Sequence, residues 1–242
     1  MNNNDFLNDF FKDMVKARST VLEKMRTEFQ LSYGEAMKDV RAAMDFNMFE
    51  YNWAMTMNMT PSEYTKPFFQ KMSEKEVNDY FICYFSKEEI LESEINSLKD
   101  ILGSGWEKTL DEVHQYILGD NFRIVIPLLV TGIEKGIKNL IAKDDEHSKL
   151  YGRSLTDKIT KHLSEVKDKN QNHLYVVKFA EVVDVLYKQR FLKSPVSAYN
   201  EVEGLNRNLI GHGNHDPDLW EKKHVYQLIA FLSSLEFIKS YS

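Results

Sequence analysis

The side chains best suited to acid–base chemistry gather in one short stretch, GLNRNLIGHGNHDP, at residues 204–217. It places Arg207, His212 and His215 in a chain that otherwise consists largely of helix-forming residues. A histidine takes or gives a proton near neutral pH, and a guanidinium holds two phosphate oxygens at once. Arg207 and His212 are therefore the candidates in this chain for proton transfer and for binding of an anionic group.

The spacing predicts how the surrounding elements position these two groups. We expect a helix over 197–211 and a turn, after which Asp216 caps a last, amphipathic helix over 217–240. Residues five apart, such as Arg207 and His212, are separated by about 140° around an ideal helix and do not share a face automatically. The length of the arginine and the glycines beside the histidine still allow both groups to reach one cleft.

Helical periodicity dominates the whole chain, and no run of alternating β-branched residues suggests a strand. Capping boxes of the form Ser/Thr-x-x-Glu start at Thr60, Ser73, Ser86 and Ser104. The sequence therefore predicts an all-α fold. The expected helices lie near 4–30, 33–57, 61–72, 74–84, 87–101, 105–118, 121–143, 155–168, 173–192, 197–211 and 217–240.

The helix expected over 121–143 has the strongest amphipathic pattern. Its predicted apolar stripe consists of Ile124, Leu128, Ile133, Ile137 and Ile141. Glu134 interrupts this apolar stretch, and Gly132 and Gly136 reduce the bulk of one side. We expect the two glycines to allow another helix to approach closely.

Charge divides the chain unevenly. The net charge of the whole chain is −6. Residues 1–120 contain 13 Lys and Arg and 22 Asp and Glu, whereas residues 121–242 contain 18 Lys and Arg and 15 Asp and Glu. Loops at 102–105 and 118–121 are candidate boundaries, although both are short enough to join helices of one domain. We predict an N-terminal helical region, 1–120, and a C-terminal domain, 121–242, and only the second approaches a phosphate backbone easily.

Cysteine content and hydropathy indicate the compartment. Cys83 is the only cysteine, which excludes an internal disulfide and suits a reducing environment; its apolar context, YFICYF, predicts a buried, inert thiol. The first residues lack the basic and apolar segments of a signal peptide, and the longest apolar run is too short to span a bilayer. We expect a cytoplasmic protein with no membrane contact.

The stretch RNLIGH at 207–212 resembles the Arg-(x4 to x6)-His signature of HEPN domains, which occur in RNA-cleaving bacterial toxins and antiphage proteins. Asn208 supplies the polar residue after the arginine, and Asn206 and Gly213 fit the flanks. The upstream stretch IPLLVTGIEKGI is similar to the IP-LL-x-x-IE helix of one HEPN variant, which more often has His where Asn208 stands. The resemblance covers about residues 121–242.

This resemblance implies an up-and-down four-helix bundle that forms a homodimer, with two Arg/His pairs in one cleft. The implied reaction is RNA cleavage without a metal or another cofactor, in which the 2′-hydroxyl attacks the adjacent phosphodiester. Arg207 would hold the phosphate and His212 would transfer the proton. Asn208 would orient the phosphate or the histidine, and Glu134 would hold Arg207 or His212 in position. A toxin or antiphage effector, a neutralising protein partner and a regulatory N-terminal region follow from the family.

Other interpretations stay open. A non-catalytic HEPN-like module would bind RNA, a nucleotide or a protein, with Arg207 and His212 as a surface arginine and a helix-terminal histidine. Glu134 is equally explained as a buried acid paired with a nearby base. A metal site at His215, Asp216 and His212 or His224 is disfavoured, because no His-x3-His pair shares a helix face.

Two compositionally biased segments have both structural and functional explanations. The Met- and aromatic-rich segment 44–69 is better explained by burial in a core or interface than by an adaptable binding surface. The Lys-rich segment 157–173 predicts a solvated helix face and is the best candidate for contact with an RNA backbone.

Overall fold

The structure is a computed structural model that describes residues 38–141, 150, 152–171, 174–185, 187, 210 and 215–241. Every regular element in these residues is a helix, which confirms the predicted all-α class. The chain divides into two compact units, Met1–Ala42 and Ala43–Ser242. The second unit contains nearly all of the described residues.

The helices of the second unit follow one another with short connections. Its first elements are η1 (Phe46–Glu50), α2 (Pro61–Phe69), α3 (Glu74–Phe85), α4 (Glu88–Leu102), η2 (Ser104–Trp106) and α5 (Glu107–Leu118). Its later elements are α6 (Phe122–Ile141), α7 (Gly152–Lys169), α8 (Leu174–Val185), η5 (Pro217–Leu219) and α11 (Lys222–Ser240). The loop at 118–121 joins two helices of this same unit, and α6 packs against both α4 and α5.

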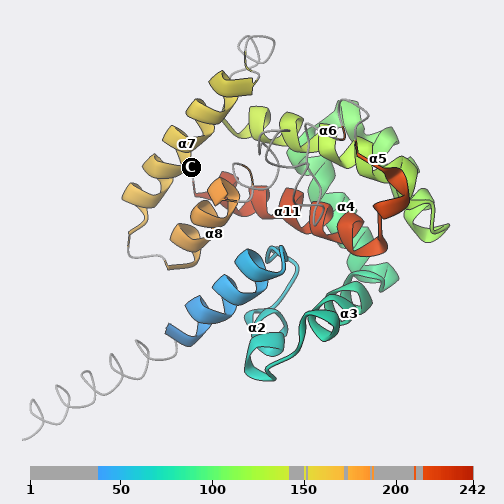
Figure 1. Cartoon of the computed structure of the whole chain (residues 1–242). Coiled ribbons are helices and arrows are strands. Elements are labelled where there is room, and N and C mark those ends of the chain that lie inside the picture. The colour runs from blue at the N-terminus through green and yellow to red at the C-terminus, as the bar shows by residue number, and fades with distance from the viewer. Residues whose placement is uncertain are drawn as a thin grey trace, which may run out of the picture. The chain divides into compact units, whose positions relative to one another are not determined.

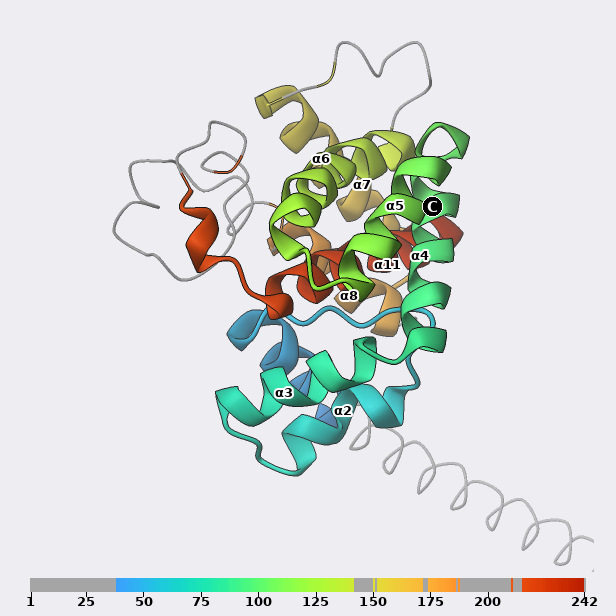
Figure 2. The same ribbon diagram turned by 90° about the vertical axis from the view of Figure 1, so that its right-hand side faces the viewer.

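Helix α11 forms the centre of the unit. It packs against α3, α4, α6 and α8, and Figures 1 and 2 show it with α4 and α6 on one side and α8 on the other. Every residue from His224 to Leu235 except Gln227 is buried. The predicted amphipathic character of this helix is therefore wrong, because neighbours cover it on all sides and no solvent face remains over that stretch.

Helix α6 meets α4 and α11 through its glycines, as predicted. A methyl group added at Gly136 would lie 3.1 Å from Ile101 Cγ2 and 3.1 Å from Leu235 Cδ1. At Gly132 the nearest atom would be Leu102 Cδ1, at 3.3 Å. The absence of side chains at these positions sets how closely the three helices approach.

The predicted apolar stripe of α6 is only partly correct. Ile133 and Ile137 are buried, whereas Ile124 is 51% exposed and Leu128 and Ile141 are half-buried. The buried side instead contains Val125, Ile126, Leu129, Val130, Ile133 and Ile137 together with the two glycines. Apolar residues surround the first half of this helix, so periodicity alone does not identify its buried side.

Two of the four predicted capping boxes are present. The Thr60 hydroxyl accepts from the Glu63 N–H at 3.3 Å and the Thr60 N–H donates to the Glu63 carboxylate at 2.9 Å; Ser73 and Glu76 form the second box. The boxes predicted at Ser86 and Ser104 are wrong. The Ser86 hydroxyl donates instead to the Tyr226 hydroxyl at 3.1 Å, and Ser104 lies in the 3-10 turn η2.

The helix predicted over 33–57 does not continue beyond η1. Asn52 has a φ of 63°, and the chain then runs without regular structure to Thr60. Trp53 anchors this segment by stacking on Phe81 at 4.9 Å between ring centroids, and its indole N–H donates to Asn78 Oδ1 at 2.8 Å. Tertiary packing of the tryptophan thus replaces helical hydrogen bonding.

The Met- and aromatic-rich segment 44–69 is buried only in part, because Met57 and Phe69 are 49% and 55% exposed. Its buried members include Met44, Met48, Trp53, Ala54, Met55, Met59 and Tyr64. Cys83, by contrast, is exposed, so the predicted buried thiol is wrong. Helix α3 buries Val77, Phe81, Tyr84 and Phe85, which share one face. Position 83 lies about 200° from position 81 and therefore points to solvent.

No helix in the described part of the chain combines the length and the apolar character needed to cross a membrane.

Candidate functional site

Most of the predicted site falls outside the described residues. Arg207, His212, Asn206 and Asn208 all belong to the range 201–209 or 211–214, of which the structure gives no description. Glu134 is the one predicted site residue that is described. The geometry that can be analysed is therefore that of Glu134 and of the chain immediately after the motif.

Glu134 is half-buried on α6, outside the contact of that helix with α4 and α11. It lies two residues before Gly136, hence about 200° around the helix from the glycine that touches Ile101 and Leu235. Its carboxylate therefore belongs to a different side of α6 from the packed core.

The chain that follows the motif has defined local structure from His215 onward. The Asp216 carboxylate accepts from the Asp218 N–H at 3.0 Å, which confirms the predicted cap. The cap starts the short turn η5, however, and the long helix begins only at Lys222. The Trp220 indole N–H donates to His215 Nδ1 at 2.8 Å, so this ring nitrogen acts as an acceptor.

Two ion pairs join this segment to the beginning of α6. Arg123 pairs with Asp218 at 2.6 Å, and Lys222 pairs with Asp120 at 3.3 Å. The Lys222 ammonium also lies 5.5 Å from the centre of the Phe122 ring. Such exposed pairs contribute little stability, so they report where the segment lies more than they hold it there. The residues directly after the motif thus lie beside the N-terminal end of α6.

His224 has a structural role that the sequence did not indicate. Its Nδ1 accepts the Glu221 N–H at 3.0 Å and completes a capping box at the start of α11. Burial lowers the pKa of His224 to about 4, and the charge of Lys223 acts in the same direction. The ring is therefore neutral at physiological pH and serves as a hydrogen-bond acceptor.

The described residues include His215, Asp216 and His224, which belong to the possible metal site considered from the sequence. Among the described residues, no group of three or more His, Cys, Asp or Glu side chains is arranged to hold a metal ion. His215 and His224 use their Nδ1 atoms as acceptors for Trp220 and Glu221, respectively. Within this part of the chain, both histidines have local structural partners.

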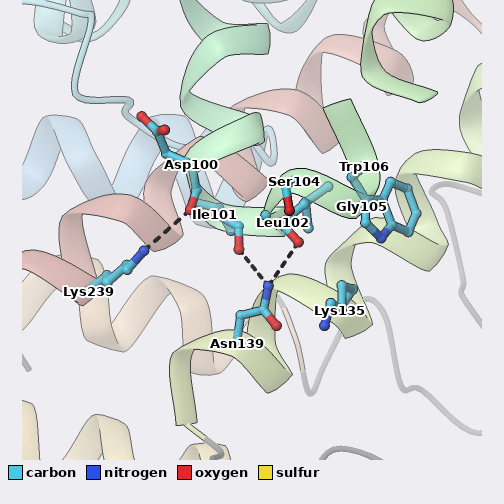
Figure 3. Close-up of a pocket in the computed structure, with 10 residues that line it drawn as sticks. Asp100, Ile101, Leu102, Ser104, Gly105, Trp106, Lys135, Asn139 and Lys239 are labelled. Carbon is cyan, nitrogen blue, oxygen red and sulfur yellow. Dashed lines mark hydrogen bonds between the residues drawn. The ribbon is translucent and has the colours of Figure 1, made fainter. Parts of the chain in front are cut away.

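Sequence reasoning also missed a pocket of about 550 Å³ at the corner between α4 and α5. Its walls include the Gly103–Gly105 turn, Trp106, Lys135, Asn139 and Lys239, as Figure 3 shows. The glycines of this turn were the only local indication, and they suggested a boundary loop. The lysines lie about thirty and more than a hundred residues away in the sequence, so no local pattern connects them.

Comparison of this chain with models of protein families, with curated proteins and with solved structures gives no match. The resemblance to HEPN domains therefore rests on the two sequence stretches 126–137 and 204–217.

Proposed function

We propose that this chain is a metal-independent endoribonuclease of the HEPN type. The observation that carries the proposal is the packing of α6 against α11. Helix α6 contains IPLLVTGIEKGI, and α11 follows the stretch that contains Arg207 and His212 after the short turn η5. The two stretches that resemble the family are some seventy residues apart, yet they belong to or adjoin neighbouring helices of one compact unit.

The position of η5 gives further support. The pairs Arg123–Asp218 and Lys222–Asp120 show that the chain just after the motif lies beside the same helix that carries Glu134. A short connection of this kind limits how far the motif can move relative to α6. A catalytic arginine and histidine need such positioning, because misplacement of a reacting group by about 1 Å costs about 100-fold in rate.

In the proposed reaction, His212 transfers the proton and Arg207 stabilises the charge on the phosphate. His212 takes the proton from the RNA 2′-hydroxyl, and the resulting oxygen attacks the adjacent phosphorus. The bond to the 5′-oxygen breaks, a cyclic phosphate forms, and a second histidine gives the leaving oxygen its proton. Arg207 stabilises the negative charge that builds on the phosphate oxygens. The second histidine comes from another copy of the chain, so the active form is a homodimer.

Cleavage of total RNA and of mixed tRNA in the presence of EDTA tests the proposal. We expect the unaltered protein to leave cyclic phosphate ends, and His212→Ala and Arg207→Ala each to lose at least about 100-fold in rate. His114→Gln, on α5, and Arg41→Ala, an exposed arginine, are matched controls that keep full activity. The mass of the protein in solution, measured by light scattering, reports the dimer.

Each outcome leads to a definite conclusion. Cleavage that His212→Ala leaves unchanged, or that EDTA abolishes, contradicts the proposed mechanism. RNA binding without any cleavage favours the non-catalytic HEPN-like module. Growth arrest on expression, relieved by His212→Ala, would support the further proposal that the chain is a cytoplasmic toxin or antiphage effector with a neutralising partner.

A further inference from the structure

The corner between α4 and α5 forms a pocket that the proposed RNA chemistry does not use. Its volume is about 550 Å³, within the range of about 300–1,000 Å³ that is common for small-molecule sites. Three separate parts of the chain build it: the end of α4 with η2, the C-terminal half of α6, and the last turn of α11 (Figure 3). All of the lining residues lie in the second compact unit.

The turn between the two helices exposes its main chain to this pocket. A side chain added at Gly103 or at Gly105 would meet nothing within 4 Å. Gly103 has a φ of 84°, which residues with a side chain rarely adopt. Ser104, between the two glycines, is exposed. A ligand can therefore approach both the peptide groups and the serine hydroxyl of the turn without a steric barrier.

Three charged residues line the pocket, of which Lys135 and Lys239 are basic and Asp100 is acidic. Lys135 of α6 and Lys239 of α11 both line it, whereas the carboxylate of Asp100 points away from Lys135 and Asn139 (Figure 3). The carbonyls at the end of α4 would repel an anion, but they already accept hydrogen bonds. Asn139 donates to the carbonyls of residues 101 and 102 at 2.8 and 3.1 Å, and Lys239 Nζ lies 3.3 Å from the Asp100 carbonyl.

A planar aromatic surface lies beside Lys135. The Trp106 ring lies against α6 beside Gly132, where a methyl group would be in ordinary contact with Trp106 Cζ3 at 3.7 Å. The side chain is half-buried and lines the pocket. A ring that is fixed on one side and accessible from the pocket offers a surface for stacking another planar ring.

We propose that this pocket binds a small phosphorylated ligand that carries a planar ring and has the size of a mononucleotide. The ammonium groups of Lys135 and Lys239 attract the phosphate, the exposed Ser104 hydroxyl offers it a hydrogen bond, and Trp106 stacks on the ring. The proposal is independent of the RNA-cleaving motif. The site is built from other residues.

Calorimetric titration of the full chain with AMP, adenosine and inorganic phosphate tests this assignment. We expect AMP to bind more tightly than either fragment, because only AMP engages both the lysines and the tryptophan. Lys135→Ala, Lys239→Ala and Trp106→Leu should each weaken AMP binding by about 10-fold or more. Lys108→Ala, an exposed lysine on α5, is the matched control and should bind as the unaltered chain does.

Several results would overturn the assignment. One is the absence of AMP binding up to about 1 mM, the weak end of the affinity scale. Another is unchanged AMP binding in the Lys135→Ala, Lys239→Ala double variant, with folding verified by circular dichroism. Equal affinities for AMP and phosphate would show that the planar ring adds nothing to binding, which contradicts stacking on Trp106. His212→Ala should bind AMP normally, and loss of binding in that variant would place the ligand at the motif instead.

Discussion

At the scale of single residues, the buried histidine at the start of α11 makes stability depend on pH. The folded pKa of His224, about 4, lies below the ordinary value of 6.5, so the unfolded chain binds more protons between these values. The contribution of neutral His224 to stability is fully present above pH 6.5 and is lost as the pH falls towards 4. That interval of about 2.5 pH units corresponds to about 3 kcal/mol.

His224→Gln should remove this dependence. Glutamine retains an acceptor for the Glu221 N–H at the third helical position but does not titrate. The quantity to compare is the free energy of unfolding of His224→Gln minus that of the unaltered chain. We expect this difference to be greater at pH 4 than at pH 7.5 by up to about 3 kcal/mol. Urea titrations across this range measure it, and parallel pH profiles for the two proteins would show that another group is responsible.

Glu94 acts in the opposite direction. Its side chain is buried on α4, where the Thr56 hydroxyl donates to Oε1 at 2.6 Å. Burial raises the pKa of Glu94 and the charge of Glu236 raises it further, against the hydrogen bonds that lower it. A raised folded pKa means that stability is greatest below the ordinary value of 4.5 and is lost as the pH rises through the folded pKa.

Glu94→Gln tests this second contribution. The amide oxygen still accepts from Thr56, while the cost of a buried charge disappears, so stability should fall less than in the unaltered chain as the pH rises above 4.5. Glu92→Gln, an exposed neighbour on the same helix, is the control and should keep the original profile. Because His224 has the opposite slope, each variant should also be compared in the His224→Gln background.

Glu134 is the described residue through which the proposed nuclease site can be probed. As a positioning residue on α6, its replacement by Gln should reduce RNA cleavage by about 10- to 100-fold, because the catalytic groups lose their orientation. RNA affinity should change by less than the rate does. Single-turnover cleavage and binding, measured together with Glu112→Gln on α5 as an exposed control, separate the two quantities. A uniform loss of binding would contradict a positioning role.

At the scale of elements, the contact of α6 with α4 and α11 depends on a missing side chain. Gly136→Val introduces atoms where even one carbon would lie 3.1 Å from Ile101 and from Leu235. Overpacking of this kind costs about 1–3 kcal/mol, more than a residue gains in helix propensity over glycine. Chemical denaturation should show this loss. Gly105→Ala, which adds a methyl group in open space, should alter stability by less than about 0.5 kcal/mol.

At the scale of the whole molecule, the compact unit Ala43–Ser242 contains the core around α11. A chain of this length buries enough apolar surface to fold alone. We expect the fragment 43–242 to unfold in one cooperative transition, with a melting temperature within a few degrees of that of the full chain. Differential scanning calorimetry measures this. A fragment without a cooperative transition would show that residues 1–42 are needed for folding.

The sequence by itself determined features that depend on neighbours within a turn or two of helix. The all-α class, the caps at Thr60 and Ser73, the Asp216 cap and the close approach at Gly132 and Gly136 were all predicted. Each follows from local hydrogen bonding or local side-chain size. The motif at 204–217 was likewise found locally, and it stays a prediction.

Only the tertiary structure decided what the helices bury. Four neighbouring helices cover α11, so it has no solvent-exposed face over most of its length. Trp53 stacks in the core at a position where the sequence predicted a continuous helix. Distant partners likewise determined the environment of Glu94 and brought Lys135 and Lys239 to one pocket. Burial and long-range contact depend on how elements pack together, and a single sequence records no such pairing.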